Sequence, residues 1–211
     1  MVRVKICGIT NWRDARTSVD AGADALGFNF YVKSPRYITP ADARAITRRL
    51  PRNVLTVGVF VNAPFETILK IARNVELNLL QLHGEESPDE VRRLGQYRPV
   101  LKAFRVHDGF KLNELARFRE ASAFLLDGFD SRLRGGTGHV FDWRVGRTAK
   151  RYGAIIIAGG LTPENVVGAI AIVEPFAVDV CSGVEASPGK KDPVRIKEFM
   201  SAVARARRKK L

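Results

Sequence analysis

The chain has 211 residues, of which 45% are hydrophobic, so it is long enough for one domain with a sizeable core and near the lower limit for a complete eight-fold β/α barrel. Its formal net charge of +13 favours an anionic ligand, nucleic acid or a solvated basic surface. No apolar run approaches the roughly 18 residues that span a membrane, and residues 1–10 lack the apolar stretch of a secretory signal, which excludes a membrane partner and predicts a cytoplasmic protein.

Short apolar runs alternate with amphipathic helical stretches along the whole chain. Several runs are continuously apolar, as expected for parallel strands that are covered on both faces. Together with helical patterns between them and after the last, they predict an α/β fold, a single-domain (β/α)8 TIM barrel over residues 1–211; a doubly wound open sheet is the competing arrangement. In chain order the runs are Val2–Cys7, Ala25–Phe30, Leu55–Phe60, Leu79–Leu82, Val100–Val106, Ala123–Leu126, Ala154–Ala158 and Phe176–Val180.

Capping signatures mark several helix starts. Ser87-Pro88-Asp89-Glu90 offers an N-cap, a proline at the first helical position and a capping-box glutamate. Thr39-Pro40, Thr162-Pro163 and Asp192-Pro193 repeat the arrangement of a cap followed by proline. Apolar residues at helical spacing then predict one buried face for the last helix: Ile196, Phe199, Met200 and Val203.

The longest segment without a helix or strand pattern runs from Gly128 to Val140. It is basic and rich in glycine, with Arg132, Arg134 and Gly136 among its residues. A loop of this length in a compact domain is usually functional. We therefore expect it to border the site.

Polar and glycine residues gather where the predicted strands end, whereas the strand bodies are mostly apolar. In a barrel these ends meet at one face, where the loops after the strands form the active site. The contrast predicts one shared pocket. The residues at the strand ends are Cys7, Asn29, Asn62, His83, Asp127, Gly159, Gly160, Cys181, Ser182 and Gly183.

The last two strands end in sequences that suit an anion. Gly159 and Gly160 follow the seventh strand, and Ser182 and Gly183 follow the eighth. Glycine lets backbone N–H groups approach a phosphate closely, and the common phosphate site of barrels lies after these strands. The alternative is that these glycines only form turns.

Cys7 and Asp127 are candidates for an acid–base pair. Each ends an apolar run and precedes a glycine. A cysteine in such a place is usually an inert small hydrophobe, and an aspartate is often a turn residue. Position alone leaves both alternatives open.

The motifs resemble those of one family, the phosphoribosylanthranilate isomerases. Lys5-Ile6-Cys7-Gly8-Ile9-Thr10 is similar to the opening motif of that family. Further similar segments follow in the family's order along nearly the whole chain. They are 26–30, Ser34-Pro35-Arg36, 57–62, 80–84, Leu126-Asp127, Gly135-Gly136-Thr137-Gly138, 141–143, Ala158-Gly159-Gly160-Leu161, Asn165-Val166, Val178-Asp179-Val180 and Ser182-Gly183-Val184-Glu185.

The resemblance implies an Amadori rearrangement in tryptophan biosynthesis, in which N-(5′-phosphoribosyl)anthranilate becomes 1-(2-carboxyphenylamino)-1-deoxyribulose 5-phosphate. Asp127 would be the general acid at the ring oxygen and Cys7 the general base at C2′. Arg36 would bind the anthranilate carboxylate, since guanidinium and carboxylate match in shape and charge. No metal or organic cofactor is implied, and the family includes monomers and homodimers. Further pocket candidates are Asn29, His83, Gly136 and Asp179.

One position departs from many relatives, which carry serine where this chain has Cys181. Strands one and eight of a closed barrel are neighbours roughly 4.8 Å apart, so Cys7 and Cys181 can lie close together. We interpret Cys181 as a serine-sized replacement that keeps the phosphate loop.

Three other functions compete with this one. A related sugar isomerase of the histidine pathway typically uses two aspartates, and Cys7 argues against it. Indole-glycerol-phosphate synthase depends on a lysine and glutamate set that the chain lacks. The charge would also suit a nucleic-acid-binding protein, but no zinc finger or other such module is present, and we expect none of its basic residues to bind nucleic acid.

Overall fold

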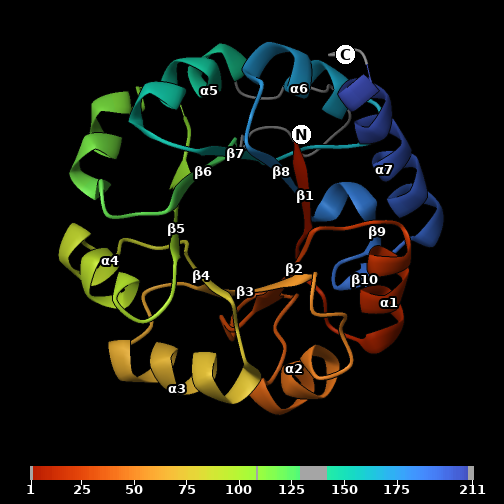
Figure 1. Ribbon diagram of the computed structural model, residues 1–211, viewed down its shortest axis with the longest axis horizontal. Helices are drawn as coiled ribbons and strands as arrows, with labels where there is room; N and C mark the ends of the chain where they lie inside the picture. The colour runs from red at the N-terminus through yellow and green to blue at the C-terminus, as the bar shows by residue number, and fades with distance from the viewer. Residues whose placement is uncertain (1, 108, 129–141, 209–211) are drawn as a thin grey trace.

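The protein is a closed barrel of eight parallel strands in sequential order, with helices around it (Figure 1). The computed structural model describes residues 2–107, 109–128 and 142–208. Gly136 and residues 129–140 of the predicted functional loop therefore lie outside the described residues. Closure confirms the predicted barrel, and the alternative of an open sheet is wrong. That residues 1–211 as a whole form one catalytic domain stays a prediction.

The strands match the apolar runs to within one residue at each end. Each is buried along most of its length because helices cover the outer face and other strands enclose the inner one. The strands are β1 (Arg3–Ile6), β2 (Ala25–Asn29), β3 (Leu55–Phe60), β4 (Leu79–Leu82), β5 (Val100–Arg105), β6 (Ala123–Asp127), β7 (Ile155–Ala158) and β8 (Ala177–Val180).

Helices connect the strands, and one of these connections is not an α-helix. Between β5 and β6 the chain forms a 3₁₀ helix, η1 (Leu112–Phe118). The α-helices are α1 (Trp12–Asp20), α2 (Pro40–Thr47), α3 (Phe65–Val75), α4 (Pro88–Gly95), α5 (Trp143–Ala149), α6 (Val166–Val173) and α7 (Pro193–Arg208), and η2 (Lys150–Tyr152) and η3 (Ser182–Val184) are short 3₁₀ turns.

The capping signatures locate three of the four predicted helix starts. Ser87 and Glu90 form the full capping box of α4, Thr39 caps α2, and the Asp192 carboxylate accepts the backbone N–H of Val194 at the start of α7. The fourth prediction is wrong by three residues, because α6 begins at Val166. The side chain of Asn165 bonds the Thr162 N–H and the Gly160 carbonyl, both at 2.8 Å, and so closes a turn ahead of the helix.

Two layers of apolar side chains hold the barrel together. The inner layer fills the barrel with small and branched residues such as Val57, Ala103, Leu125 and Ile156. The outer layer packs the helices onto the strands and includes Phe199 of the predicted α7 stripe, whose four members are all buried. Because side chains alternate along a strand, each strand contributes to both layers.

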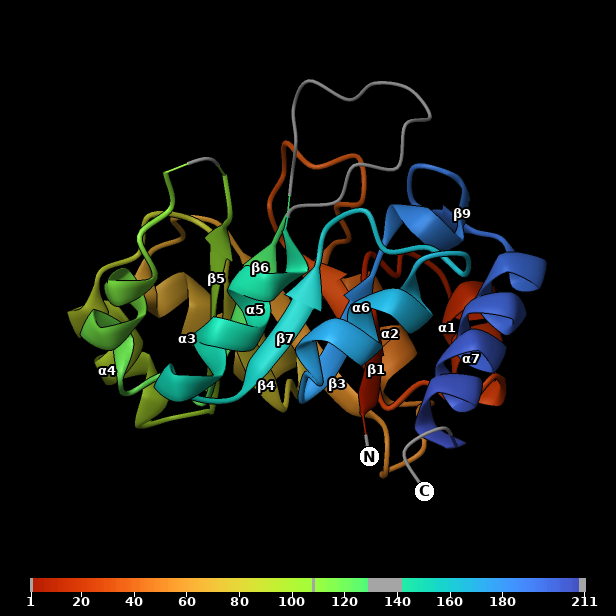
Figure 2. The same ribbon diagram turned by 90° about the horizontal axis from the view of Figure 1, so that it is seen from above.

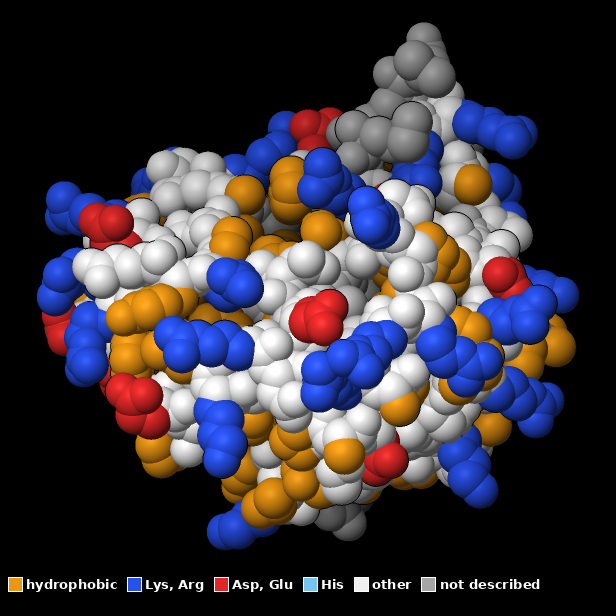
Figure 3. All heavy atoms as spheres, turned by 60° about the horizontal axis from the view of Figure 1, so that its bottom comes forward, with side chains coloured by type: hydrophobic (Ala, Val, Ile, Leu, Met, Phe, Trp, Pro, Cys, Tyr) orange, Lys and Arg blue, Asp and Glu red, His pale blue; other side chains and the backbone are white. Residues whose placement is uncertain are grey.

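The strands all run toward the end of the barrel at which a two-stranded hairpin lies (Figure 2). The hairpin, β9 (Glu185–Ser187) and β10 (Lys190–Lys191), follows β8 and was not predicted. Lys and Arg side chains are distributed over the face shown in Figure 3, with Asp and Glu side chains between them. Within the described residues, no helix has the length and apolar character needed to cross a membrane.

Candidate active site

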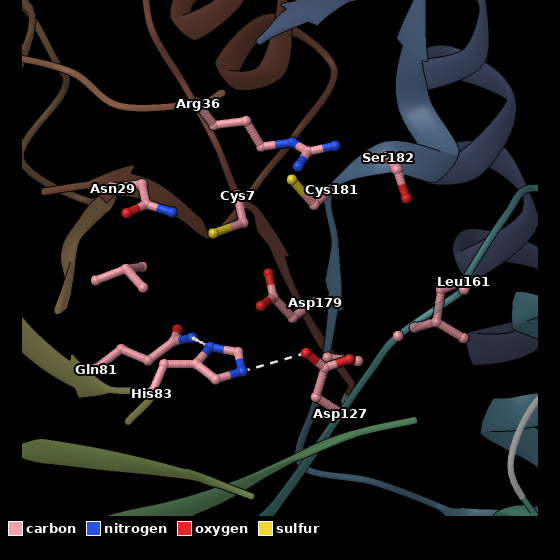
Figure 4. A pocket seen from close by; sticks show the side chains of 14 residues that line it. Cys7, Asn29, Arg36, Gln81, His83, Asp127, Leu161, Asp179, Cys181 and Ser182 are labelled. Atoms are coloured by element: carbon pink, nitrogen blue, oxygen red, sulfur yellow. Dashed lines mark hydrogen bonds and ion pairs between the residues drawn. The ribbon is translucent and has the colours of Figure 1, made fainter. Parts of the chain in front are cut away.

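A cavity of about 330 Å³ lies at the carboxyl ends of the strands. It brings together side chains from β2, β3, β4, β6, β7 and β8 and from loops that follow the strands, including Cys7 directly after β1 (Figure 4). Predicted residues that line it are Cys7, Asn29, Arg36, His83, Asp127, Gly159, Gly160, Asp179, Cys181 and Ser182; residues of the cavity that were not predicted include Val59, Gln81 and Leu161.

Two predicted strand-end residues lie elsewhere. Asn62 has φ +51° and its side chain accepts the Glu85 N–H at 2.7 Å, so it shapes a loop. Gly183 does not line the cavity; a Cβ there would meet the Leu161 carbonyl oxygen at 1.8 Å. Gly183 therefore allows the loop after β8 to pack against the loop after β7.

Cys7 follows β1 and is held among buried charged groups. Lys5 lies two residues earlier on the same side of the strand, and its Nζ is 2.8 Å from Asp179 Oδ2 on β8. Both side chains are almost fully buried, at 4% and 7% exposure. A buried ion pair must be well hydrogen-bonded to persist, and Lys5 also bonds Cys7.

These neighbours make Cys7 acidic. A hydrogen bond from Cys181 lowers the pKa of Cys7 most, burial opposes the change, and the charges of Lys5 and Lys191 lower it further. Conversely, the hydrogen bond to Cys7 and burial raise the pKa of the Cys181 thiol. The lowered pKa of Cys7 is what a cysteine acting as a base requires, because the thiolate and not the thiol accepts a proton.

Asp179 is a carboxylate whose negative charge is disfavoured by its buried position in the cavity. Burial raises the pKa of its carboxyl to about 7, even though Lys5 lowers it, and the negative charges of Cys7 and Asp127 add to the increase. Its Oδ1 is buried and has no hydrogen-bond partner within the described residues. A buried polar atom without a partner is uncommon and calls for an explanation.

Asp127 ends β6 and faces the imidazole of His83. Its Oδ2 lies 3.2 Å from Nε2 of His83, and Nδ1 of His83 lies 3.0 Å from the Gln81 amide nitrogen (Figure 4). With that nitrogen donating to Nδ1, the imidazole proton is on Nε2 and is donated to Asp127. Within the described residues, no Lys or Arg forms an ion pair with Asp127.

Glycines create the space in which the two candidate groups sit. A Cβ at Gly27 would lie 2.6 Å from the Cys7 sulfur. Gly159 has φ +78°, and a Cβ there would lie 2.5 Å from Asp127 Oδ1. Any larger residue at either position would displace the group beside it.

The loop after β7 has the backbone geometry of an anion site. Gly159 and Gly160 are both left-handed, with φ +78° and +63°, which favours glycine. No acceptor among the described residues bonds either backbone N–H group. Ser182 of the next loop lines the same part of the cavity.

Arg36 reaches the cavity from the loop after β2 and is paired with Glu185 of the hairpin. Its Nε and Nη2 donate to the two carboxylate oxygens at 2.7–3.1 Å. Burial raises the pKa of Glu185, but Arg36 and Lys191 together bring it below the ordinary value. Lys191 is 1% exposed and lies 3.0 Å from Glu185, so the three side chains keep one net positive charge at the cavity wall.

Four partners in this network escaped the sequence analysis: Lys5, Gln81, Glu185 and Lys191. A signal existed for two of them. Lys5 and Gln81 are polar residues within apolar runs, and each lies two positions before a predicted site residue, so each faces the same way. Glu185 and Lys191 belong to the hairpin, which has no apolar pattern of its own.

The cavity could hold an anionic organic molecule between an acidic thiol and a carboxyl group. Within the described residues, no group of three or more His, Cys, Asp or Glu is arranged to hold a metal ion. Fold and site thus define the class of the protein: a (β/α)8-barrel enzyme with acid–base groups at the carboxyl ends of its strands.

Comparisons with known proteins identify the family. Residues 4–202 match the family model of N-(5′-phosphoribosyl)anthranilate (PRA) isomerase. The chain is 50% identical over 200 residues to the N-(5′-phosphoribosyl)anthranilate isomerase of Pelobacter propionicus, which covers 95% of this chain and 94% of that protein. The chain belongs to the N-(5′-phosphoribosyl)anthranilate isomerase family. It is therefore an isomerase, and the predicted family is confirmed.

Solved structures of the same family superpose closely on this chain. Phosphoribosyl anthranilate isomerase from Thermotoga maritima superposes with a TM-score of 0.91 at 49% identity and covers 97% of this chain and 99% of that one. A complex of such an enzyme with reduced 1-(o-carboxyphenylamino)-1-deoxyribulose 5-phosphate superposes with a TM-score of 0.88 at 47% identity, with the same coverage. The Thermotoga maritima enzyme is also described as dimeric.

Proposed function

We propose that this protein converts N-(5′-phosphoribosyl)anthranilate to 1-(2-carboxyphenylamino)-1-deoxyribulose 5-phosphate, a step of tryptophan biosynthesis, with Cys7 as general base and Asp127 as general acid. One observation carries the assignment of roles. The cavity has an acidic thiol held by buried cations on one side and, on the other, a carboxyl group that faces His83 and Gln81 and no Lys or Arg of the described residues.

The reaction requires one proton transfer of each kind. An acid protonates the ring oxygen, the ring opens, and C1′ becomes part of a Schiff base with the anthranilate nitrogen. A base then removes the C2′ proton to give an enolamine. Asp127 supplies the first proton and the Cys7 thiolate accepts the second. Positioned transfers of this type typically contribute about 10²–10⁴-fold in rate.

The two anionic ends of the substrate would bind on opposite walls. The N–H groups of Gly159 and Gly160, which no described residue accepts, suit the phosphate together with Ser182 and the loop at Gly183. Arg36 would bind the carboxylate while Glu185 holds its side chain in place. Asn29 and His83 would border the ribose between them.

Fluorescence of the anthranilate group gives a direct assay of turnover. Cys7→Ala and Asp127→Asn should each lower kcat by about two orders of magnitude or more, with thermal unfolding curves close to that of the wild type. Asp24→Asn is a matched control, because Asp24 lies at the opposite end of the barrel, where it bonds the Val4 N–H. Near wild-type kcat in both site variants would refute the assignment.

Arg36→Ala tests the carboxylate site separately. Loss of one partner from a buried charge pair typically weakens binding by about 2–5 kcal/mol. Arg36 is 23% exposed, so we expect the lower end of this range, about a 30-fold rise in KM. An unchanged KM would remove Arg36 from the substrate site.

Cellular setting and assembly belong to the same proposal. An acidic thiol next to a second thiol keeps its function only where thiols stay reduced, which supports a cytoplasmic location. The protein would act as a monomer or a homodimer on its small-molecule substrate, without a cofactor and without nucleic acid.

A further inference from the structure

Asp179 is the buried charged group of the cavity that the two proton transfers above do not use. It lines the cavity, its Oδ2 binds Lys5 at 2.8 Å, and its Oδ1 lacks a partner within the described residues. A buried acceptor without a hydrogen bond destabilises the fold. The Oδ1 atom of Asp179 is therefore free to accept a hydrogen bond or a proton from a bound molecule.

The proton balance of the proposed reaction leaves one transfer unassigned. Substrate and product are isomers, but hydrogen moves at four atoms: C2′ and O2′ each lose one, and C1′ and O4′ each gain one. Cys7 takes the proton from C2′ and can return it to C1′. Asp127 gives its proton to O4′, so it must regain one before the next turnover. Within the substrate, the hydrogen left to supply it is that of the C2′ hydroxyl.

Asp179 lies where such a proton would pass. In Figure 4 its carboxylate is between Cys7, which would face C2′, and Asp127. The negative charges of both groups act on its pKa, so all three lie within electrostatic reach of one another. With its pKa raised to about 7, chiefly by burial, this carboxyl can both accept and release a proton near neutral pH.

We propose that the Asp179 carboxylate is a third catalytic group, which accepts the proton of the C2′ hydroxyl from the enolamine and returns it to Asp127. The O2′–H bond breaks and its electron pair forms the C2′=O bond. The C1′=C2′ electron pair takes the proton held by the Cys7 thiol, which restores the thiolate. The proton on Asp179 then moves to Asp127, so every group ends as it began and no external reactant is needed.

The inference rests on the proposed function and adds a role distinct from support of Lys5. A structural role would act on C2′–H cleavage, because loss of Asp179 would disturb Lys5 and with it the Cys7 thiolate. A role at O2′ would act after C2′–H cleavage. The isotope effect of a substrate carrying deuterium at C2′ distinguishes the structural role of Asp179 from the role at O2′.

The experiment compares Asp179→Asn with Lys5→Met. We expect Asp179→Asn to lower kcat by at least about ten-fold, with a C2′ isotope effect on kcat that falls toward unity and with loss of deuterium from recovered substrate. Lys5→Met slows C2′–H cleavage itself, so its isotope effect stays as large as in the wild type or rises. Binding of the reduced product, a non-reacting analogue, reports whether each variant keeps its site.

Asp179→Glu provides a second variant, which keeps the charge beside Lys5 but moves the carboxylate by one methylene group, and the same loss of isotope effect is expected. If both Asp179 variants keep the isotope effect of Lys5→Met, or a kcat within about three-fold of the wild type, Asp179 has no step of its own. Failure of the wild type to turn over the substrate would instead refute the proposed function.

Discussion

The two sides of the cavity solve opposite electrostatic problems. Around Cys7, buried cations from β1 and β10 stabilise a negative charge, and the pKa of the thiol is lowered. Around Asp127, the partners are the imidazole of His83 and, behind it, the amide of Gln81, and the carboxyl is 23% exposed. A base must be available as an anion, whereas an acid must not be held as one by a neighbouring cation. The distribution of lysines within one cavity therefore separates the two roles.

The largest expected effect comes from a disulfide between Cys7 and Cys181 on the base side of the cavity. Cys7 and Cys181 follow neighbouring strands, with the Cys7 N–H bonded to the Val180 carbonyl at 2.8 Å, and their side chains share a hydrogen bond. Mild hydrogen peroxide should couple the two thiols, with loss of two hydrogens by intact mass and of nearly all activity, because a disulfide sulfur cannot accept the C2′ proton. Dithiothreitol should restore activity.

Cys181→Ser is the matched variant for this experiment. Its hydroxyl can donate the hydrogen bond that the Cys181 thiol donates, so reduced activity should stay within a few-fold of the wild type. The variant cannot form the disulfide, although direct oxidation of the Cys7 thiolate would also inactivate it. Identical loss and recovery in both proteins would show that no disulfide is involved.

A smaller effect is expected from removing one cation on the base side. Lys5→Met should raise the pKa of Cys7, since Lys5 lowers it. At a given pH less thiolate is present, so the acidic limb of the kcat/KM profile should move to higher pH, and kcat/KM at neutral pH should fall by roughly 10–100-fold. The unpaired Asp179 will also destabilise the fold, so unfolding curves accompany the kinetics.

Lys197→Met controls for the loss of positive charge, because Lys197 lies exposed on α7. Its pH profile should match that of the wild type. An unshifted profile in Lys5→Met would mean that Lys5 does not set the charge of the base.

On the acid side, the sharpest change is steric. Gly159→Ala would place a Cβ 2.5 Å from both Asp127 Oδ1 and the Gly128 backbone nitrogen at a φ of +78°, so the carboxyl and the backbone that carries it must move. We expect kcat to fall by about ten-fold, since a displacement of this size removes the acid from its position. Gly160→Ala has a similar φ of +63° but no atom within 4 Å of the new Cβ. It should raise KM through the phosphate loop and leave kcat nearly unchanged; equal effects on kcat would contradict the steric explanation.

The smallest effect should lie away from the cavity. Arg207 near the end of α7 bonds the Val2 carbonyl and lies 3.3 Å from Asp24 Oδ2. Arg207→Ala should lower the free energy of unfolding by about 1 kcal/mol and leave kcat unchanged, as urea denaturation and the fluorescence assay can measure. Loss of kcat in a folded variant would mean that this end of the barrel influences the site.

The sequence predicted the barrel well because parallel strands leave a strong local signal. An apolar run such as Leu55–Phe60 and a cap such as Ser87 each act within a few residues, and both are found as expected. The start of α6 was misplaced because Asn165 bonds backward to Gly160 and Thr162. Such a turn competes with the helix cap, and the sequence alone does not say which one forms.

The site was predicted in part for a similar reason. Strand-end residues such as Cys7 and Asp127 could be placed in one pocket from topology alone. Their charge states could not, because these depend on contacts between residues far apart in the chain, such as Lys5 with Asp179. The pairing of Arg36 with Glu185 also arises only when the hairpin folds over the loop after β2.

The pairing of β1 with β8 has a consequence for how the enzyme comes into being. Lys5 and Asp179 are 174 positions apart, so the environment that makes Cys7 a base is assembled only when the last strand docks against the first. During synthesis on the ribosome, the cysteine emerges early as an ordinary thiol, and it stays one until almost the entire chain has been released. The base can therefore be activated only after the last strand has been made, and any shorter chain lacks the Asp179 partner of Lys5.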